Sequence, residues 1–331
     1  MEIIRPSKSF DGLLPEAYAV IRSVNESAWH HGAQQILPPR VTYSRSLDKV
    51  CKAWLEVIPA LDSLQAEFRF DQPTESQHLV ETKYAALLQA LNEHLDACFS
   101  VLRCAAPKPA SVEGLFSDRV VRAQKLPGFS TFDEQVLKGY RQSRLGAAAN
   151  ILKHAESRLR LLGGRTDTDI VLGYYLDGPL PSGAIGPNTR LHADGNSAFS
   201  FNRDMMLHFW WLYRSSQLMA NVLRQTLGKS ITPAKEDVAN IDTSWVELCK
   251  YIESLPPHFF PDESLLPYPL IRFDRSTNKL HLRFPAGRQP SNFRTGLRLT
   301  AFITIDDGGQ PYKIPYTGDD EMTVEATLHH H

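Results

Sequence analysis

The stretch from Ser197 to Ser216, SAFSFNRDMMLHFWWLYRSS, places Arg203 and His208 five residues apart among aromatic residues. An imidazole exchanges a proton near neutral pH, and a guanidinium can hold phosphate oxygens through two parallel hydrogen bonds. On a helical wheel at about 100° per residue, His208 lies on the packed face with Phe201 and Met219, and Arg203 lies roughly 140° away from it. The pattern therefore allows two interpretations: a reactive pair, or a core histidine with a solvent-facing arginine.

A second polar group lies in the segment AANILKHAESRLR, where Asn150, His154 and Arg158 are four residues apart. In a helix this spacing places all three on one ridge. One hypothesis is that the ridge faces His208 and builds a composite cleft. His154 would then act as general base, and Asn150 and Arg158 would bind substrate. The alternative is that these side chains bond loop backbone and brace the fold.

The run from Arg203 to His208, RDMMLH, resembles the Arg-x4–6-His motif of the HEPN superfamily, with its polar residue after the arginine. The resemblance covers this motif and the general run of long helices, about residues 77–228. HEPN domains are helical bundles found in bacterial toxin and antiphage ribonucleases. The resemblance implies that Arg203 and His208 are catalytic, that they line a cleft between two protomers of a homodimer, and that RNA is cleaved without a metal.

A third group, His192-x-Asp194, has the order that begins a facial metal triad, and His281 followed by Arg288 could complete it. This arrangement resembles that of iron and 2-oxoglutarate dioxygenases. Those enzymes carry their ligands on a β jelly roll, whereas two predicted helices separate the halves here. An Asp-Gly turn with a surface histidine is the alternative. We therefore expect no metal at His192 and no cofactor.

The overall charge argues against some partners. The 36 basic and 37 acidic residues give a formal net charge of −1, whereas a protein dedicated to duplex DNA normally has a basic surplus. Arginines and phenylalanines alternate locally over residues 272–298, as in sheets that hold single-stranded RNA by stacking and phosphate contact. A solvated sheet face is the alternative for that region.

The sequence also indicates where the protein resides. The four cysteines form no CxxC pair and no metal-ligand spacing. There is no signal-peptide pattern, and no apolar run approaches the ~18 residues of a membrane span. We expect a soluble, cytoplasmic protein without a membrane partner. The last four residues, 328–331, are typical of the remnant of a purification tag.

Hydrophobic periodicity predicts a mainly helical protein. The clearest helices cover 77–103, with one continuous apolar stripe, and 132–162, which is predicted to end at Gly163-Gly164. Weaker helical patterns cover 15–29, 47–58 and 235–254. The segment 168–178, TDIVLGYYLDG, is rich in β-branched and aromatic residues and predicts a strand followed by a long loop.

The last part of the chain has a β pattern. Five prolines over 256–269 indicate an extended connector. LIRFD and LHLRF predict one hairpin, LRLTAFITI and YKIPY predict a second one, and EMTVEAT predicts an edge strand. The predicted fold is α+β: a helical bundle over 1–255 with a strand and loop insertion at about 165–200, the connector, and an antiparallel β region over 270–327.

These patterns lead to three hypotheses about function. The first is a HEPN-like protein that binds RNA or cleaves it without a metal. The second is a non-catalytic interaction or structural module, in which the same polar residues brace the bundle. The third is a non-haem metal oxygenase.

Overall fold

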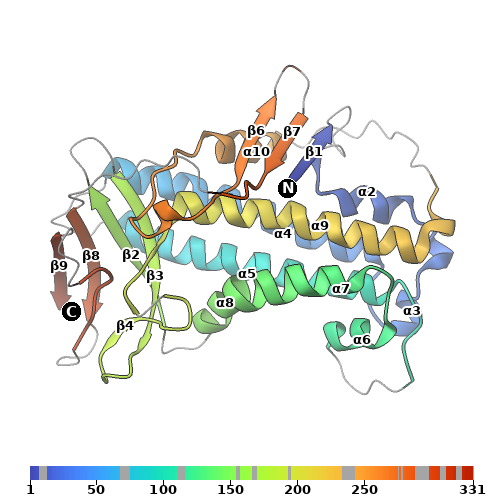
Figure 1. The fold of residues 1–331 in the computed structure, drawn as a ribbon, viewed down its shortest axis with the longest axis horizontal. Helices are drawn as coiled ribbons and strands as arrows, with labels where there is room; N and C mark the ends of the chain where they lie inside the picture. Colours follow the sequence, from blue (N-terminus) through green and yellow to red (C-terminus); the bar gives the residue numbers. More distant parts are fainter. Residues whose placement is uncertain are drawn as a thin grey trace.

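The computed structural model describes residues 1–6, 13–67, 75–110, 116–153, 157–165, 170–192, 195–232, 243–274, 276, 279–287, 298–305, 311–317 and 323–330, the last strand and 298–305 as backbone. Long helices lie along the length of the molecule, and a sheet stands across one end of them (Figure 1). The protein is therefore α+β and mainly helical, as its sequence predicts.

Three of the long rods in the helical part are single helices. They are α4 (Pro39–Glu67), α5 (Glu75–Arg103) and α9 (Phe201–Leu227), which run side by side in Figure 1. The predicted helix over 77–103 is confirmed, because α5 covers all of it. The apolar stripe of α5 is buried as expected, at Val80, Tyr84, Leu87, Leu91, Leu95, Cys98 and Leu102. Burial of one stripe along each rod holds the bundle together.

A fourth rod contains α7 (Phe129–Phe132), the π-helix η2 (Asp133–Leu145) and α8 (Gly146–Lys153). The prediction of one helix over 132–162 is correct for the start of this rod and wrong for its end. Leu159–Arg165 form the strand β2, which pairs along its whole length with a neighbouring strand. Leucine spacing in a short apolar segment fits a helix or a strand, and here the cross-strand hydrogen bonds decide.

Shorter helices fill the ends of the bundle. They are α2 (Glu16–Ser23), η1 (Glu26–Ala28), α3 (His31–Gln34), α6 (Ser117–Gln124), η4 (Gly228–Ser230), α10 (Thr243–Ser254) and η5 (Glu263–Leu265). The three weaker helical patterns correspond to α2, α4 and α10. In the described part of the chain, no helix combines the length and the apolar character that crossing a bilayer requires.

The larger sheet has the strand order β4-β3-β2-β8-β9, and β5 pairs with β3. Its strands are β2, β3 (Ile170–Pro179), β4 (Ile185–Pro187), β5 (Phe199–Ser200), β8 (Arg298–Ile305) and β9 (Thr323–His330). The strand predicted from TDIVLGYYLDG is β3. The C-terminal strand β8 pairs antiparallel with β2 and parallel with β9.

The smaller sheet has the order β1-β7-β6, all antiparallel. Its strands are β1 (Glu2–Pro6), β6 (Leu270–Asp274) and β7 (Lys279–Arg283), so the first predicted hairpin is confirmed. The second one is wrong, because β8 pairs with β2 and β9, and Tyr312 of YKIPY forms a bridge with Ile185. Alternation predicts strands, but it does not specify which edge each strand will join.

The proline-rich segment 256–269 packs against the bundle. Phe259, Phe260 and Tyr268 are buried, and η5 places Glu263 in the interior. Because the hairpin that follows pairs with the N-terminal β1, the C-terminal strands do not form a sheet of their own. They complete two sheets that begin earlier in the chain.

Candidate functional site

The first turn of α9 places the carboxylate of Asp204 in the interior, with none of its side chain exposed. Its Oδ1 accepts hydrogen bonds from Arg144, with Nε at 2.9 Å and the second guanidinium nitrogen also in contact. Its Oδ2 accepts from the hydroxyls of Tyr84 at 2.8 Å and Tyr174 at 2.6 Å. Four elements, α5, η2, β3 and α9, therefore meet at one carboxylate.

His208 lies one helical turn after Asp204 and extends this group. Its Nε2 lies 3.1 Å from Oδ2 of Asp204, and its Nδ1 lies 2.7 Å from the hydroxyl of Tyr140. A neutral imidazole with its proton on Nε2 donates to the carboxylate and accepts from the phenol. We call the set the Asp204 cluster; it consists of Tyr84, Tyr140, Arg144, Tyr174, Asp204 and His208.

The cluster favours a charged aspartate and neutral tyrosines. Burial alone would raise the pKa of the Asp204 carboxyl, but the Arg144 guanidinium, then His208 and the Tyr174 hydroxyl, hold that pKa well below its ordinary value. Burial, and then the Asp204 charge, raise the pKa of Tyr84, Tyr140 and Tyr174 well above that of a free phenol. The cluster is therefore an ionised aspartate held by a guanidinium and neutral hydroxyls.

The local structure explains why these side chains converge. In α9, Asp204 and His208 are at i and i+4 and share one face. In η2, Tyr140 and Arg144 are also four residues apart and both bond side chains of α9, and π-helical segments often occur at functional sites. The Arg144 guanidinium also lies over the ring of Phe199, 3.8 Å from its centroid, which adds a cation–π contact.

Arg203, the other half of the predicted reactive pair, binds elsewhere. Its side chain is 7% exposed, so the expectation of a solvent-facing arginine is wrong. One terminal nitrogen donates to the carbonyl of Pro267 at 2.9 Å, and the other lies 3.6 Å from the carboxyl of Glu263. The connector 256–269 supplies both partners, so the wheel could not predict this burial. The arginine that joins the histidine's group is Arg144.

The predicted ridge of Asn150, His154 and Arg158 does not form. Asn150 is exposed on α8, and His154 lies outside the described residues. Arg158 is not helical: it precedes β2, and its backbone N–H donates to Oδ1 of Asp177 at 2.5 Å. Because Arg158 lies outside any helix, the i, i+4, i+8 geometry does not extend to it.

Space next to the cluster is very small. The cavity that reaches Tyr140 has a volume of about 10 Å³ and is lined by Tyr140, Trp211 and His94 among others. A volume of ~10–15 Å³ holds one water molecule. The Tyr140 ring stacks on Trp211, with ring centroids 4.9 Å apart. The order hydroxyl, imidazole, carboxylate is that of a catalytic triad, but here the hydroxyl faces a packed core.

The two histidines of the proposed metal triad, His192 and His281, lie beside different sheets. Nε2 of His192 accepts a hydrogen bond from the backbone N–H of Leu176 at 3.1 Å, beside the larger sheet. His281 is in β7 of the smaller sheet, and Asp194 and Arg288 lie outside the described residues. Within the described ranges, no three histidine, cysteine or carboxylate side chains are grouped so that they could hold a metal ion. His192 is fully buried, so the alternative of a surface histidine is also wrong.

Two phenylalanines of the predicted basic and aromatic sheet face inward. Phe273 is buried, and the ring of Phe284 lies 5.6 Å from that of Trp210. Aromatic rings that stack on bases must be exposed. These two rings belong to the hydrophobic core instead.

No family model, curated protein or solved structure matches the chain.

Sequence reasoning missed most of the Asp204 cluster. In the sequence, Asp204 stands out only as the polar residue after Arg203, and Tyr84 lies on the apolar stripe of α5. That position was itself a signal: a charged residue or a tyrosine on a buried stripe needs a hydrogen-bonding partner. Counting such residues would have predicted a buried polar cluster, although not its connections.

Proposed function

We propose that this protein is a non-catalytic interaction or structural module, whose buried polar cluster fixes the bundle against the sheet. The observation that supports this most is the saturation of Asp204. Both of its oxygens accept hydrogen bonds from side chains of other elements, and none of it is exposed. A carboxylate used in this way holds elements in place and has no capacity left for a substrate.

The burial of His208 supports the same proposal. The side chain is 1% exposed, and both of its ring nitrogens are bonded within the protein. A general base must come within about 3 Å of the proton that it removes. For RNA to reach His208, the stacked pair of Tyr140 and Trp211 would have to separate. A structural role requires no such rearrangement.

The alternative proposal is the HEPN-like RNA-binding or ribonuclease role. The feature that favours it is the relay from Tyr140 through His208 to Asp204, which has the order of groups that general acid–base catalysis uses. In that case the relay would act after the bundle opened, or at an interface with a second copy. The ribonuclease proposal therefore predicts that the wild-type protein cleaves RNA.

One experiment separates the two proposals. Wild-type protein and His208→Ala are assayed for binding and cleavage of single-stranded RNA, and the melting temperature of each is recorded. A structural module gives no cleavage in either protein, and His208→Ala loses roughly 1–3 kcal/mol of stability through its cavity and stranded partners. A ribonuclease gives cleavage by the wild type that falls ~10²–10⁴-fold in the variant.

A matched control uses another buried histidine. His94 of α5 is 1% exposed; it lines the same small cavity as Tyr140, but its ring bonds Ser46 and contacts Cys98, which are outside the Asp204 cluster. Its pKa is lowered to about 4 by burial, so it stays neutral and structural at pH 7. His94→Ala should lower the melting temperature as well. Loss of RNA cleavage in His208→Ala but not in His94→Ala would overturn the structural proposal.

A further inference from the structure

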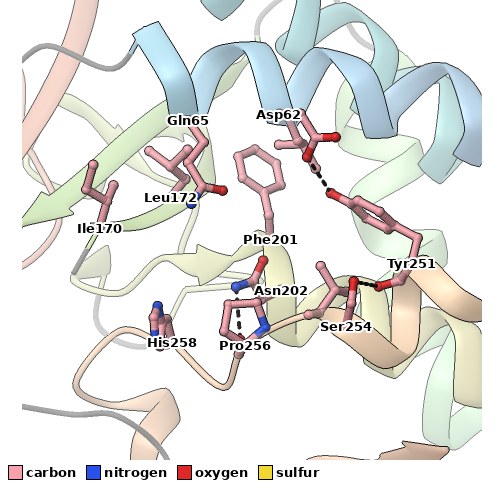
Figure 2. A pocket seen from close by; sticks show the side chains of 12 residues that line it. Asp62, Gln65, Ile170, Leu172, Phe201, Asn202, Tyr251, Ser254, Pro256 and His258 are labelled. Carbon is pink, nitrogen blue, oxygen red and sulfur yellow. Dashed lines mark hydrogen bonds between the residues drawn. The ribbon is translucent and has the colours of Figure 1, made fainter.

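A cavity of about 150 Å³ lies between the end of α4, the start of β3, the start of α9 and the end of α10 (Figure 2). An apolar protein cavity of ~150 Å³ is large enough to hold benzene. It is thus the right size for one small organic molecule. The Asp204 cluster does not line it, so its chemistry is independent of the bracing role.

Six of the twelve residues that line the cavity are apolar: Leu61, Ile170, Leu172, Phe201, Leu255 and Pro256. Figure 2 shows the Leu172 side chain and the Phe201 ring below α4, where they give the wall an apolar part. Such surfaces favour the hydrocarbon part of a ligand.

Three of the polar side chains that line the cavity donate hydrogen bonds within the protein. The Tyr251 hydroxyl donates to Oδ1 of Asp62 at 3.3 Å, and the Ser254 hydroxyl donates to the Tyr251 carbonyl at 2.8 Å. The side-chain amide of Asn202 donates to the carbonyl of Pro256 at 3.0 Å. The amide oxygen of Asn202 and the carboxylate of Asp62 remain able to accept hydrogen bonds at the cavity (Figure 2).

Asp62 is the one carboxylate among the described residues that line the space, and neither lysine nor arginine is among them. Gln65 and His258 also line it, so the lining offers N–H groups as well as acceptors. The aromatic rings of Tyr251 and Phe201 also lie here, and aromatic faces attract cations. A positively charged ligand can pair with Asp62, whereas a carboxylate or a phosphate would be repelled by it.

We propose that this cavity binds a small primary amine, with its ammonium group at Asp62 and Asn202 and a short apolar body against Leu172 and Phe201. A suitable probe is benzylamine, which has a benzene-sized body. Benzyl alcohol and phenylacetate have the same benzyl body with a neutral and an anionic head. Differences among the three therefore report the head group alone.

The binding of each probe to the full chain is measured by isothermal titration calorimetry. Benzylamine should bind roughly three- to tenfold more tightly than benzyl alcohol, because a partly exposed charge pair contributes little more than that. Phenylacetate should bind the weakest. Asp62→Asn should remove the preference for the amine and leave the affinity for benzyl alcohol unchanged. Asp96→Asn, another exposed carboxylate, should change neither.

Two further variants test the location. Leu172→Trp fills the cavity from β3, and Ser254→Phe obstructs it from the exposed end of α10, where a larger side chain does not disturb the core. Each variant should abolish the binding of benzylamine and of benzyl alcohol. The circular dichroism melting curve of Ser254→Phe should stay that of the wild type. Failure of the wild type to bind benzylamine would overturn the proposal. Equal affinity for all three probes, or binding that survives Ser254→Phe, would overturn it too.

Discussion

Nε2 of His208 lies 3.1 Å from Oδ2 of Asp204, one turn earlier in the same helix, and the aspartate is the residue that organises the site. The arginine on Asp204 comes from η2, at Arg144, and two tyrosines come from α5 and β3. Asp204, which lies between Arg203 and His208 in the sequence, is thus the centre of the site.

Asp204→Asn should be strongly destabilising. It leaves the Arg144 guanidinium buried without its counter-charge, and breaking a buried pair in this way costs about 3–5 kcal/mol. Chemical denaturation at pH 7 gives the free energy of unfolding. The matched control is Asp96→Asn, which breaks the exposed pair of Asp96 with Arg141 and should cost less than about 1 kcal/mol. Equal effects of the two changes would contradict the bracing role of Asp204.

The link between Tyr140 and His208 should appear as coupling. Tyr140→Phe and His208→Gln each break the hydrogen bond between the two side chains, so their effects on stability should not add. Residues in direct contact typically show coupling of about 0.5–3 kcal/mol in a double-mutant cycle. A control cycle of Tyr140→Phe with Tyr251→Phe, whose hydroxyl donates to Asp62 outside the Asp204 cluster, should be closer to additive. Additive effects of Tyr140→Phe and His208→Gln would show that the relay is not formed in solution.

Glu263 should make stability fall as the pH rises. Burial raises its pKa to about 7 in the folded protein, against the opposing effects of Arg203 and Arg144. The unfolded chain releases this proton near pH ~4.3, and the folded protein keeps it until about pH 7, so the folded state loses stability across that window. Glu263→Gln removes this titration.

The Glu263→Gln variant should therefore gain stability relative to the wild type between pH 5 and pH 8, by up to roughly 3 kcal/mol. Thermal melts of both proteins across this range measure the difference. The variant keeps an acceptor for the backbone N–H of Ser200, which the wild-type carboxyl holds at 2.8 Å. A difference in stability that does not change with pH would contradict the buried, protonated state of Glu263.

His192 should act in the opposite direction. Burial, and then the Arg144 charge, lower its pKa to about 3, whereas an unfolded histidine takes up a proton near pH ~6.5. The unfolded state therefore binds more protons between these values, and stability is lost as the pH falls through them. His192→Gln should lose less stability than the wild type between pH 6.5 and pH 4. The same acid sensitivity in both proteins would argue against a neutral, buried His192.

The sequence by itself determined the elements whose pattern is local. The stripe of α5, the β-branched run of β3 and the inward position of His208 on α9 follow from side-chain periodicity along a single segment. A period of 3.6 or 2 shows which face of an element avoids water, and this holds whatever the element packs against. For the same reason, the hairpin of β6 and β7 was predicted from its own residues.

Only the tertiary structure decided which elements pack against each other through their buried faces. Arg203 is buried because the connector carries Glu263 and Pro267 to it, from sixty or more residues further along the chain. Leu159–Arg165 form a strand because β3 and β8 supply hydrogen bonds on both sides. The partners of Asp204 come from positions up to 120 residues away. Periodicity contains no information on such pairings, because they depend on how whole elements fill space together.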